Sequence, residues 1–357
     1  MRITALVIST VCMMAGLVAA AQSTGQSGPW EIEDSGSSAG LRGVHAVGGG
    51  VVWASGTGGT ILRSEDTGYL WQQCAMPPGA GKLDFRGIWA WDAQNVLVLS
   101  SGPGDLSRLY ETTDGCSSWK LLLTNPDKAG FWDGLLFLDR QHGVIYGDPA
   151  PVPGRNDHVR FGLLVTHDGG NTWSPAAELE PLPGESVFAG SNSAMTADEG
   201  QIWLGTSKAR VLWTDVRRGD LTTWQSTQTP VASGNDSSGV FSLAFRDQNH
   251  GIAVGGDYRK PEEATGTAAY TSDGGKHWSA AHKPPHGYRS AVAWDAADKA
   301  WITVGSNGSD ISYDDGDTWQ WLDSGNWNAL SLPWAVGPNG QIGKLGTLPA
   351  HPTGVSR

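Results

Sequence analysis

One eight-residue pattern recurs along almost the whole sequence: Ser or Thr, any residue, Asp, any residue, Gly, two further residues and Trp. A clear copy runs from Thr166 to Trp173. The Asp carboxylate can accept backbone N–H groups of a tight turn, the Gly can adopt a positive φ, and the Trp can anchor the returning strand in an apolar layer. Each copy therefore predicts a β-hairpin whose turn is held closed from inside. The aspartates at the equivalent position are Asp66, Asp114, Asp168, Asp273 and Asp314.

The spacing of this pattern limits how the chain can be divided. Copies separated by roughly 40–55 residues predict one repeat array instead of two or three independent domains. The 50 Gly, the 18 Trp and a charged fraction of only 17% favour many short strands with tight turns over helices or disorder. The net charge of −12 supplies no basic face for a phosphate backbone, so no nucleic-acid partner is expected.

The segments between copies alternate in short runs broken by Gly, Asn or Asp, which is typical of strands. The first unit holds four such runs, at Gly43–Val47, Val51–Ser55, Thr60–Ser64 and Trp71–Ala75. The same order follows in each later unit. The sequence thus predicts an all-β fold made of four-stranded units.

The two ends of the chain resemble each other. Trp30–Gly36 parallels Trp319–Gly325 without a gap, so Trp30 lies where a fourth strand belongs, whereas the last unit, from about Ser331, lacks a fourth strand. The two ends together would complete one unit. We therefore predict a seven-bladed β-propeller of four-stranded blades whose last blade is closed by the N-terminal strand, a ring with few exposed strand edges.

The first residues have the composition of a secretory signal peptide. Met1-Arg2 carries positive charge, Ile3–Val18 is apolar, and Ala19–Ala21 offers a cleavage site. We expect residues 1–21 to be removed and residues 22–357 to form a single exported propeller, periplasmic or secreted, with no membrane span and monomeric.

Three cysteines are present, and Cys12 would leave with the signal peptide. Cys74 and Cys116 then remain on neighbouring units in an oxidising compartment. They either form a disulfide or remain as two buried thiols. No His or Cys cluster has ligand spacing, so no metal site is expected.

The Asp–Gly–Trp turns resemble the Asp-boxes of BNR-repeat propellers, which occur in sialidases, sortilin-like receptors and some endoglucanases. Over about Trp30 to Ala350, the seven units most resemble the family of the photosystem II stability/assembly factor and its bacterial relatives. This resemblance implies a binding or assembly role. Because Asp-boxes lie at the outer hairpins of such blades, it also implies a structural role for the repeated aspartates.

The topology of a propeller indicates where a ligand would bind. The innermost strand of each blade starts, and the second strand ends, on the same face, so these positions surround one mouth of the channel. Long polar segments fall there, at Gly147–Arg160, Gly184–Ser193 and Gly255–Lys260. The residues that precede the seven inner strands are Arg42, Arg86, Asp133, Asn192, Phe241, Arg289 and Ser331.

The first functional hypothesis is a non-catalytic propeller that binds a protein or an anionic or carbohydrate ligand at this mouth. Arginines recognise carboxylates with two parallel hydrogen bonds, which gives the hypothesis a mechanism. Its alternative is that the same arginines form salt bridges between blades. The candidate ligand-binding residues are Arg42, Arg86, Arg289, Asp148 and Asp257.

The second hypothesis is a secreted glycoside hydrolase, which the resemblance to sialidases implies. Two of Asp133, Asp148, Glu185 and Asp257 could serve as acid and base; the resemblance also offers Tyr258 or Tyr288 as a nucleophile. The sialidase Phe-Arg-Ile-Pro start is absent, and Phe85–Ile88 is a partial match. A third hypothesis, an oxidoreductase, lacks a dinucleotide fingerprint, a haem motif and iron–sulfur cysteines, so no cofactor is expected.

Overall fold

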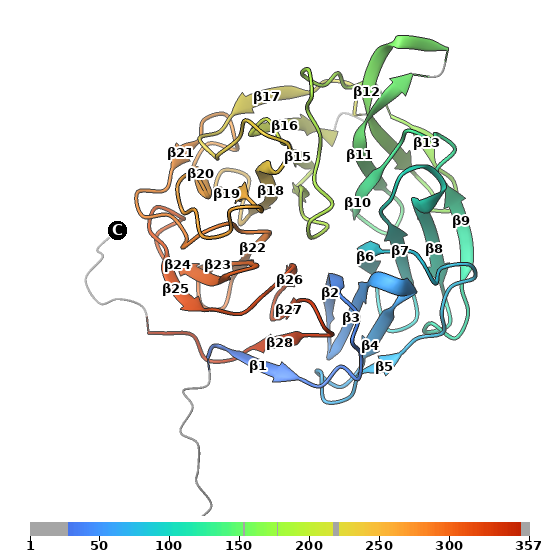
Figure 1. Cartoon of the computed structure of the whole chain (residues 1–357), viewed down its shortest axis with the longest axis horizontal. Coiled ribbons are helices and arrows are strands. Elements are labelled where there is room, and N and C mark those ends of the chain that lie inside the picture. The colour runs from blue at the N-terminus through green and yellow to red at the C-terminus, as the bar shows by residue number, and fades with distance from the viewer. Residues whose placement is uncertain (1–27, 153, 177, 217–220, 351–357) are drawn as a thin grey trace, which may run out of the picture.

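The computed structural model describes residues 28–152, 154–176, 178–216 and 221–350. The described residues form seven sheets of four strands each. The sheets stand around a common centre like the blades of a propeller, and the chain passes from one blade to the next in sequence order (Figure 1). The predicted all-β seven-bladed fold is confirmed. The predicted signal peptide lies outside the described residues.

Blades 1 to 3 are antiparallel meanders in which the first strand is innermost. Two short 3-10 helices follow second strands, η1 (Thr57–Gly59) and η2 (Gly104–Leu106). The strands are β2 (Leu41–Gly48), β3 (Val51–Gly56), β4 (Ile61–Ser64) and β5 (Gln72–Gln73); β6 (Phe85–Ala90), β7 (Val96–Ser100), β8 (Arg108–Thr112) and β9 (Lys120–Thr124); β10 (Trp132–Phe137), β11 (Gly143–Val152), β12 (Arg155–Thr166) and β13 (Ser174–Pro175).

Blades 4 to 6 repeat this order. The β11–β12 hairpin of blade 3 is longer than the corresponding hairpins of blades 4 to 6, and it projects from the disc (Figure 1). The strands are β14 (Met195–Asp198), β15 (Gln201–Gly205), β16 (Arg210–Asp215) and β17 (Gln225–Gln228); β18 (Ser238–Phe245), β19 (Gly251–Asp257), β20 (Ala268–Thr271) and β21 (Ser279–Ala280); β22 (Ala291–Asp295), β23 (Ala300–Gly305), β24 (Gly308–Ser312) and β25 (Gln320–Asp323).

Blade 7 is built from both ends of the chain. It contains β26 (Ala329–Ser331), β27 (Trp334–Val336), β28 (Ile342–Leu345) and, as its outermost strand, β1 (Trp30–Glu33). β1 pairs antiparallel with β28 from Trp30 opposite Leu345 to Glu33 opposite Ile342. The Trp30 indole N–H also donates to Ser309 Oγ of blade 6, at 3.0 Å. The N-terminal strand therefore closes the ring, as predicted.

The repeated aspartates hold the turns between third and fourth strands. In the copy in blade 3, Asp168 Oδ1 accepts the Thr172 N–H at 2.9 Å and the Thr166 hydroxyl at 2.8 Å, and Gly170 has a φ of 93°. The hydrogen bonds to the Asp168 carboxylate lower its pKa to about 2, and the bond from the Thr172 hydroxyl contributes most. The same backbone and hydroxyl bonds form at Asp66, Asp114, Asp273 and Asp314.

Apolar side chains fill the contacts between blades. Trp203 of blade 4 is fully buried, stacks on Phe245 of blade 5 with ring centres 3.7 Å apart, and donates its indole N–H to the Gly274 carbonyl. Cys74 and Cys116 form a disulfide that joins blade 1 to the turn between β8 and β9 of blade 2. Among the described residues, no helix is long and apolar enough to cross a membrane.

Candidate ligand-binding site at the channel mouth

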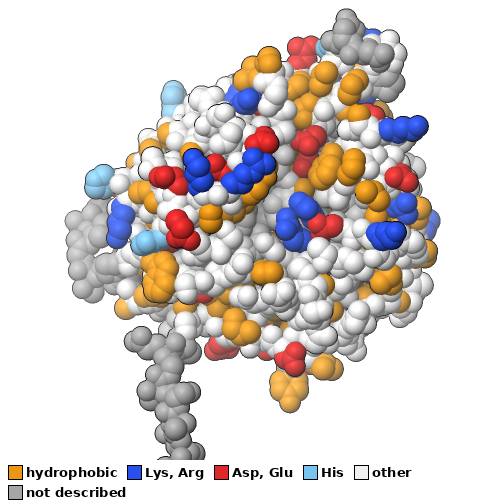
Figure 2. All heavy atoms as spheres, in the orientation of Figure 1, with side chains coloured by type: hydrophobic (Ala, Val, Ile, Leu, Met, Phe, Trp, Pro, Cys, Tyr) orange, Lys and Arg blue, Asp and Glu red, His pale blue; other side chains and the backbone are white. Residues whose placement is uncertain are grey.

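A pocket of about 550 Å³ lies at the mouth of the channel, where the inner strands begin. Figure 2 shows this face of the disc, with basic and acidic side chains beside a hollow near its middle. Six of the candidate catalytic or ligand-binding residues from the sequence line the pocket, in addition to Phe241. They are Arg42, Arg86, Asp133, Asp148, Tyr258 and Tyr288.

In three inner strands, a β-bulge orients one of these side chains. The registers of the inner strands with their neighbours shift between Leu41 and Gly43, between Phe85 and Gly87, and between Trp132 and Gly134. The residues skipped are Arg42, Arg86 and Asp133, and a bulge of this kind turns a side chain away from the regular pleat. Blades 1 to 3 thus present one charged side chain each at the mouth.

The glycine after each charged residue is required by close packing between blades. A Cβ atom at Gly43 would lie 2.9 Å from the Arg86 carbonyl oxygen of blade 2, and one at Gly134 would lie 2.6 Å from Asn192 Oδ1, just before blade 4. Any side chain there would force neighbouring blades apart. The Arg-Gly, Arg-Gly and Asp-Gly pairs therefore combine a directed charged group with tight blade contact.

The two arginines have different surroundings. Arg42 is partly buried, and no hydrogen-bond partner for its Nε lies among the described residues. Burial and, secondarily, the charge of Arg86 lower the pKa of Arg42. Arg86 Nε donates to Asp84 at 2.8 Å, and its Nη1 donates to the Ala189 carbonyl at 3.2 Å. Arg86 is thus held in place, whereas Arg42 keeps an unused donor.

Two carboxyl groups lie beside the arginines. Asp133 is 2% exposed, and no described residue gives its Oδ2 a hydrogen-bond partner. Burial, reinforced by the charge of Asp148 and opposed by that of Arg86, raises the pKa of Asp133 well above its usual range. Asp148 Oδ1 accepts the Val187 N–H at 2.9 Å, and burial raises the pKa of Asp148.

Aromatic rings form another part of the pocket wall. Phe188 and Phe241 stack with centroids 3.7 Å apart, and Tyr288 meets Phe241 edge-on at 4.9 Å. Tyr258 lies 6.1 Å from Phe241 and is 44% exposed. Burial raises the pKa of Tyr288, so this tyrosine remains a neutral phenol. The pocket has one charged wall and one aromatic wall.

The structure places three candidates away from this pocket. Arg289 is fully buried and gives Nε to Asp310 Oδ2 at 2.8 Å, and it also donates to Asn307. The expectation of three available arginines at one mouth is therefore corrected to two, because Asp310 of β24 captures the third.

The other two candidates also have partners of their own. The Glu185 side chain is buried against Arg210, whose Nε donates to it at 2.8 Å, and accepts the Thr206 hydroxyl at 2.6 Å. Asp257 accepts the Arg259 N–H at 3.0 Å and the Asn235 amide at 3.2 Å. Neither carboxylate lines the pocket. Both act within loops that frame the mouth.

Phe188 was not singled out in the sequence, although it forms part of the aromatic wall. It lies within the long Gly184–Ser193 segment that the sequence placed at the mouth. Its stacking on Phe241 depends on a contact between segments that no local pattern shows. The length of the segment indicated that it has a role at the mouth. The sequence did not show which of its residues points into the pocket.

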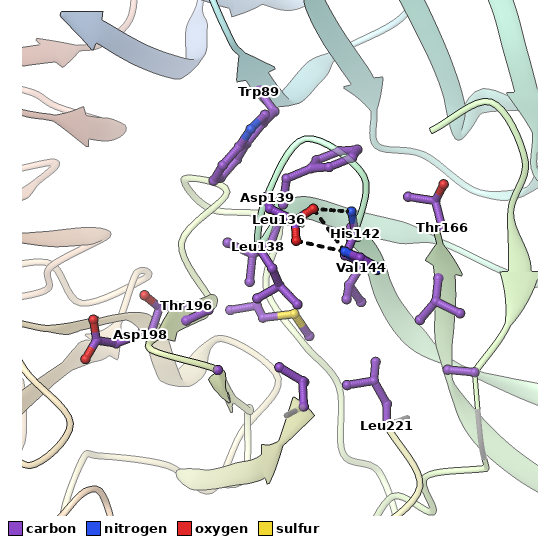
Figure 3. Close-up of a pocket in the computed structure, with 18 of the residues that line it drawn as sticks. Trp89, Leu136, Leu138, Asp139, His142, Val144, Thr166, Thr196, Asp198 and Leu221 are labelled. Carbon is purple, nitrogen blue, oxygen red and sulfur yellow. Dashed lines mark hydrogen bonds and ion pairs between the residues drawn. The ribbon is translucent and has the colours of Figure 1, made fainter. Parts of the chain in front are cut away.

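A larger cavity of about 850 Å³ lies toward the other ends of β10 and β14, between blades 3 and 4. Figure 3 shows its lining, with apolar Leu136, Leu138, Val144 and Leu221 around it and Asp139 bonded to His142. Among the described residues that line it, none has a buried polar atom without a partner. The mouth pocket, although smaller, is the one with unused recognition groups.

Comparison with solved structures shows the fold. A structure described as YCF48 bound to D1 peptide matches with a TM-score of 0.62 and 14% identity, over 89% of this chain and 97% of that chain. YCF48 from Cyanidioschyzon merolae matches with a TM-score of 0.59 and 16% identity, over 89% and 98%. The GH74 xyloglucanase from Xanthomonas campestris gives 0.50 and 16%, over 83% of this chain and 56% of that chain.

No protein-family model matches the sequence, and no curated protein matches it. The described residues contain no group of three or more His, Cys, Asp or Glu side chains that could hold a metal ion. The mouth pocket is therefore the basis for assigning a function.

Proposed function

We propose that this protein is an exported, non-catalytic propeller that binds a protein partner or an anionic ligand through the mouth pocket. The observation that carries the proposal is Arg42, whose partly buried guanidinium keeps an unused Nε donor in a pocket that Arg86 also lines. A buried donor without a partner costs about 1–3 kcal/mol, and an oxyanion bound to the same guanidinium would offset that cost. Guanidinium groups match carboxylates in shape and charge.

Two further observations support this proposal. One of the structures with a similar fold is YCF48 bound to D1 peptide, so a propeller of this shape can hold a peptide. Export is supported by the apolar stretch Ile3–Val18 that follows Met1-Arg2. The binding role requires no cofactor and no catalytic residue.

The test compares partner capture by the wild type and by single substitutions at the mouth. Proteins from the exported fraction are crosslinked to the purified propeller, and captured species are quantified by mass spectrometry. Arg42→Gln and Arg86→Gln are expected to lose the same species. Arg140→Gln is the control, because that side chain is 68% exposed and pairs with Asp92, away from the mouth. Capture that is identical in all four proteins contradicts the proposal.

A glycoside hydrolase is the second candidate, favoured by one observation. Asp133 and Asp148 line the same pocket, and the pKa of each is raised, which suits a general acid. Similarity to a GH74 xyloglucanase agrees with this reading at the level of the fold. Activity on a broad glycoside panel that Asp148→Asn abolishes would establish the enzyme and replace the binding proposal.

A further inference from the structure

Asp133 is the least ordinary side chain at the mouth. It lines the pocket, yet only 2% of it is exposed, and its Oδ2 has no hydrogen-bond partner among the described residues. The bulge between Trp132 and Gly134 holds the residue in this position. This oxygen is shielded from solvent, and no described residue donates a hydrogen bond to it.

The groups that face Asp133 compensate a negative charge there only in part, because burial outweighs the charge of Arg86 and the hydrogen bond from the Asp148 backbone N–H. The carboxylate of Asp148 from β11 repels it, and the Tyr146 phenol from the same strand lies close enough for the charge of Asp133 to raise the pKa of that phenol. Arg86 from β6 attracts it but is already bonded to Asp84. An ionised carboxylate that is buried without a partner is unfavourable by several kcal/mol and takes up a proton instead.

We propose that Asp133 is a neutral carboxylic acid and donates its O–H to an oxyanion bound in the pocket, so that it selects carboxylate ligands over cationic ones. This inference rests on the proposed function, because it assigns the specificity of the same pocket. Arg42 and Arg86 supply the positive charge, and a protonated Asp133 adds a donor without repelling the anion. An ionised Asp133 would act in the opposite sense and favour an ammonium group.

The proposal predicts how the binding of an anion changes with pH. A carboxyl group with a raised pKa stays protonated through acid conditions and ionises as the pH rises through that pKa. Binding of an anion is therefore expected to hold at low pH and to weaken as Asp133 ionises. Asp148, Arg86 and Tyr146 are the other titratable groups that face it and contribute to the profile.

The probes are three ring compounds of similar size: benzoate, benzamide and benzylamine. Each carries a ring for the wall formed by Phe188, Phe241, Tyr258 and Tyr288. They differ in charge, being anionic, neutral and cationic. Calorimetric titration of the full chain is expected to rank benzoate above benzamide and benzylamine last. Tighter binding of benzylamine than of benzoate overturns the proposal.

Two substitutions separate the hydrogen bond from the shape of the side chain. Asp133→Leu removes the donor, and a hydrogen bond to a charged group is worth enough to weaken benzoate roughly tenfold or more. Asp133→Asn keeps an N–H donor at a similar place, so the loss is expected to be clearly smaller. Equal affinities of the two variants for benzoate overturn the inference. If Arg42→Gln still abolishes benzoate binding in that case, the proposed function stands while the role of Asp133 fails.

A measurement without ligand tests the protonation state directly. The infrared difference spectrum between the wild type and Asp133→Asn at neutral pH is expected to contain the carbonyl stretch of a protonated carboxyl group. Deuterium exchange of the solvent should shift that band. A difference spectrum that contains only carboxylate bands overturns the proposal, whether or not any probe binds.

Discussion

At the scale of single residues, the repeated aspartates and the mouth residues show how differently one residue type can be used. Asp168 is an exposed carboxylate whose hydrogen bonds lower its pKa to about 2. Asp133 is buried, and its pKa is raised well above the usual range. The surroundings alone separate a turn-holding carboxylate from a carboxyl group that can recognise a ligand.

The lowered pKa of Asp168 predicts how stability depends on pH. Because the folded pKa is about 2 and the ordinary value is 3.8, the ionised side chain stabilises the fold above pH 3.8, and this contribution disappears as the pH falls through about 2. The difference in urea midpoint between the wild type and Asp168→Ala should therefore be constant near neutral pH and shrink on acidification.

The control for this series is Asn171→Ala in the same turn. Its amide donates to the Asp168 carbonyl at 2.7 Å, and the substitution removes that hydrogen bond without removing a titrating group. Its effect on the urea midpoint should vary little with pH. Parallel pH profiles for the two variants would show that the carboxylate charge does not stabilise the turn.

Arg289 shows what a residue's position in the repeat could not predict. It occupies the same place before an inner strand as Arg42 and Arg86, so the alignment of units sends all three to the mouth. The neighbouring third strand of blade 6 carries Asp310, which is fully buried and binds the guanidinium. Whether an arginine faces a ligand or a neighbour thus depends on a partner in another strand, which the spacing does not reveal.

At the scale of elements, the blades were readable because each strand and turn carries its own local signal. The Ser/Thr–Asp–Gly–Trp order specified the turn, and the alternating runs specified the strands. The segment between β13 and β14 carries no such signal, and it supplies Phe188 to the aromatic wall. The frame of the site could therefore be predicted, whereas the contacts of its loops could not.

The Cys74–Cys116 disulfide predicts a loss of stability that chain entropy can estimate. The two cysteines are 42 residues apart in sequence. Closing a loop of that length stabilises the folded state by about 4 kcal/mol in the chain-entropy model, and measured losses for native disulfides are typically about 2–5 kcal/mol. The double variant Cys74→Ser, Cys116→Ser should unfold at a clearly lower denaturant concentration.

Reductant provides the matched comparison. Dithiothreitol should lower the unfolding midpoint of the wild type toward that of the double variant and leave the double variant unchanged. Identical midpoints of the oxidised wild type and the double variant would mean that the crosslink between blades 1 and 2 contributes nothing.

At the scale of the whole molecule, stability depends on one joint between the chain ends. β1 is the outermost strand of blade 7, and its Trp30 packs against Trp327 with ring centres 5.3 Å apart. Comparing a chain that begins at residue 35 with one that begins at residue 28 isolates the contribution of β1. The amides of Lys344 in β28 and of Gly346, whose N–H donates to the Pro29 carbonyl, face β1, and their hydrogen exchange should be faster in the shorter chain.

A synthetic peptide of residues 28–36 provides the control for that deletion. Added to the shorter chain, it should occupy the vacated edge of β28 and slow the exchange again. Exchange in β28 that is equally slow in both chains would show that the strand pairing does not hold the ring closed.

The pairing of β1 with β28 also has a consequence for biosynthesis. The ribosome makes β1 before any other strand of the ring and makes β28 last. β1 therefore has no strand to pair with until translation is nearly finished. A message cut short before β28 leaves β1 without its partner strand, and such an unpaired strand is a site for aggregation and proteolysis. The closed ring therefore forms only after synthesis has passed β28, and products truncated before it keep an unpaired β1.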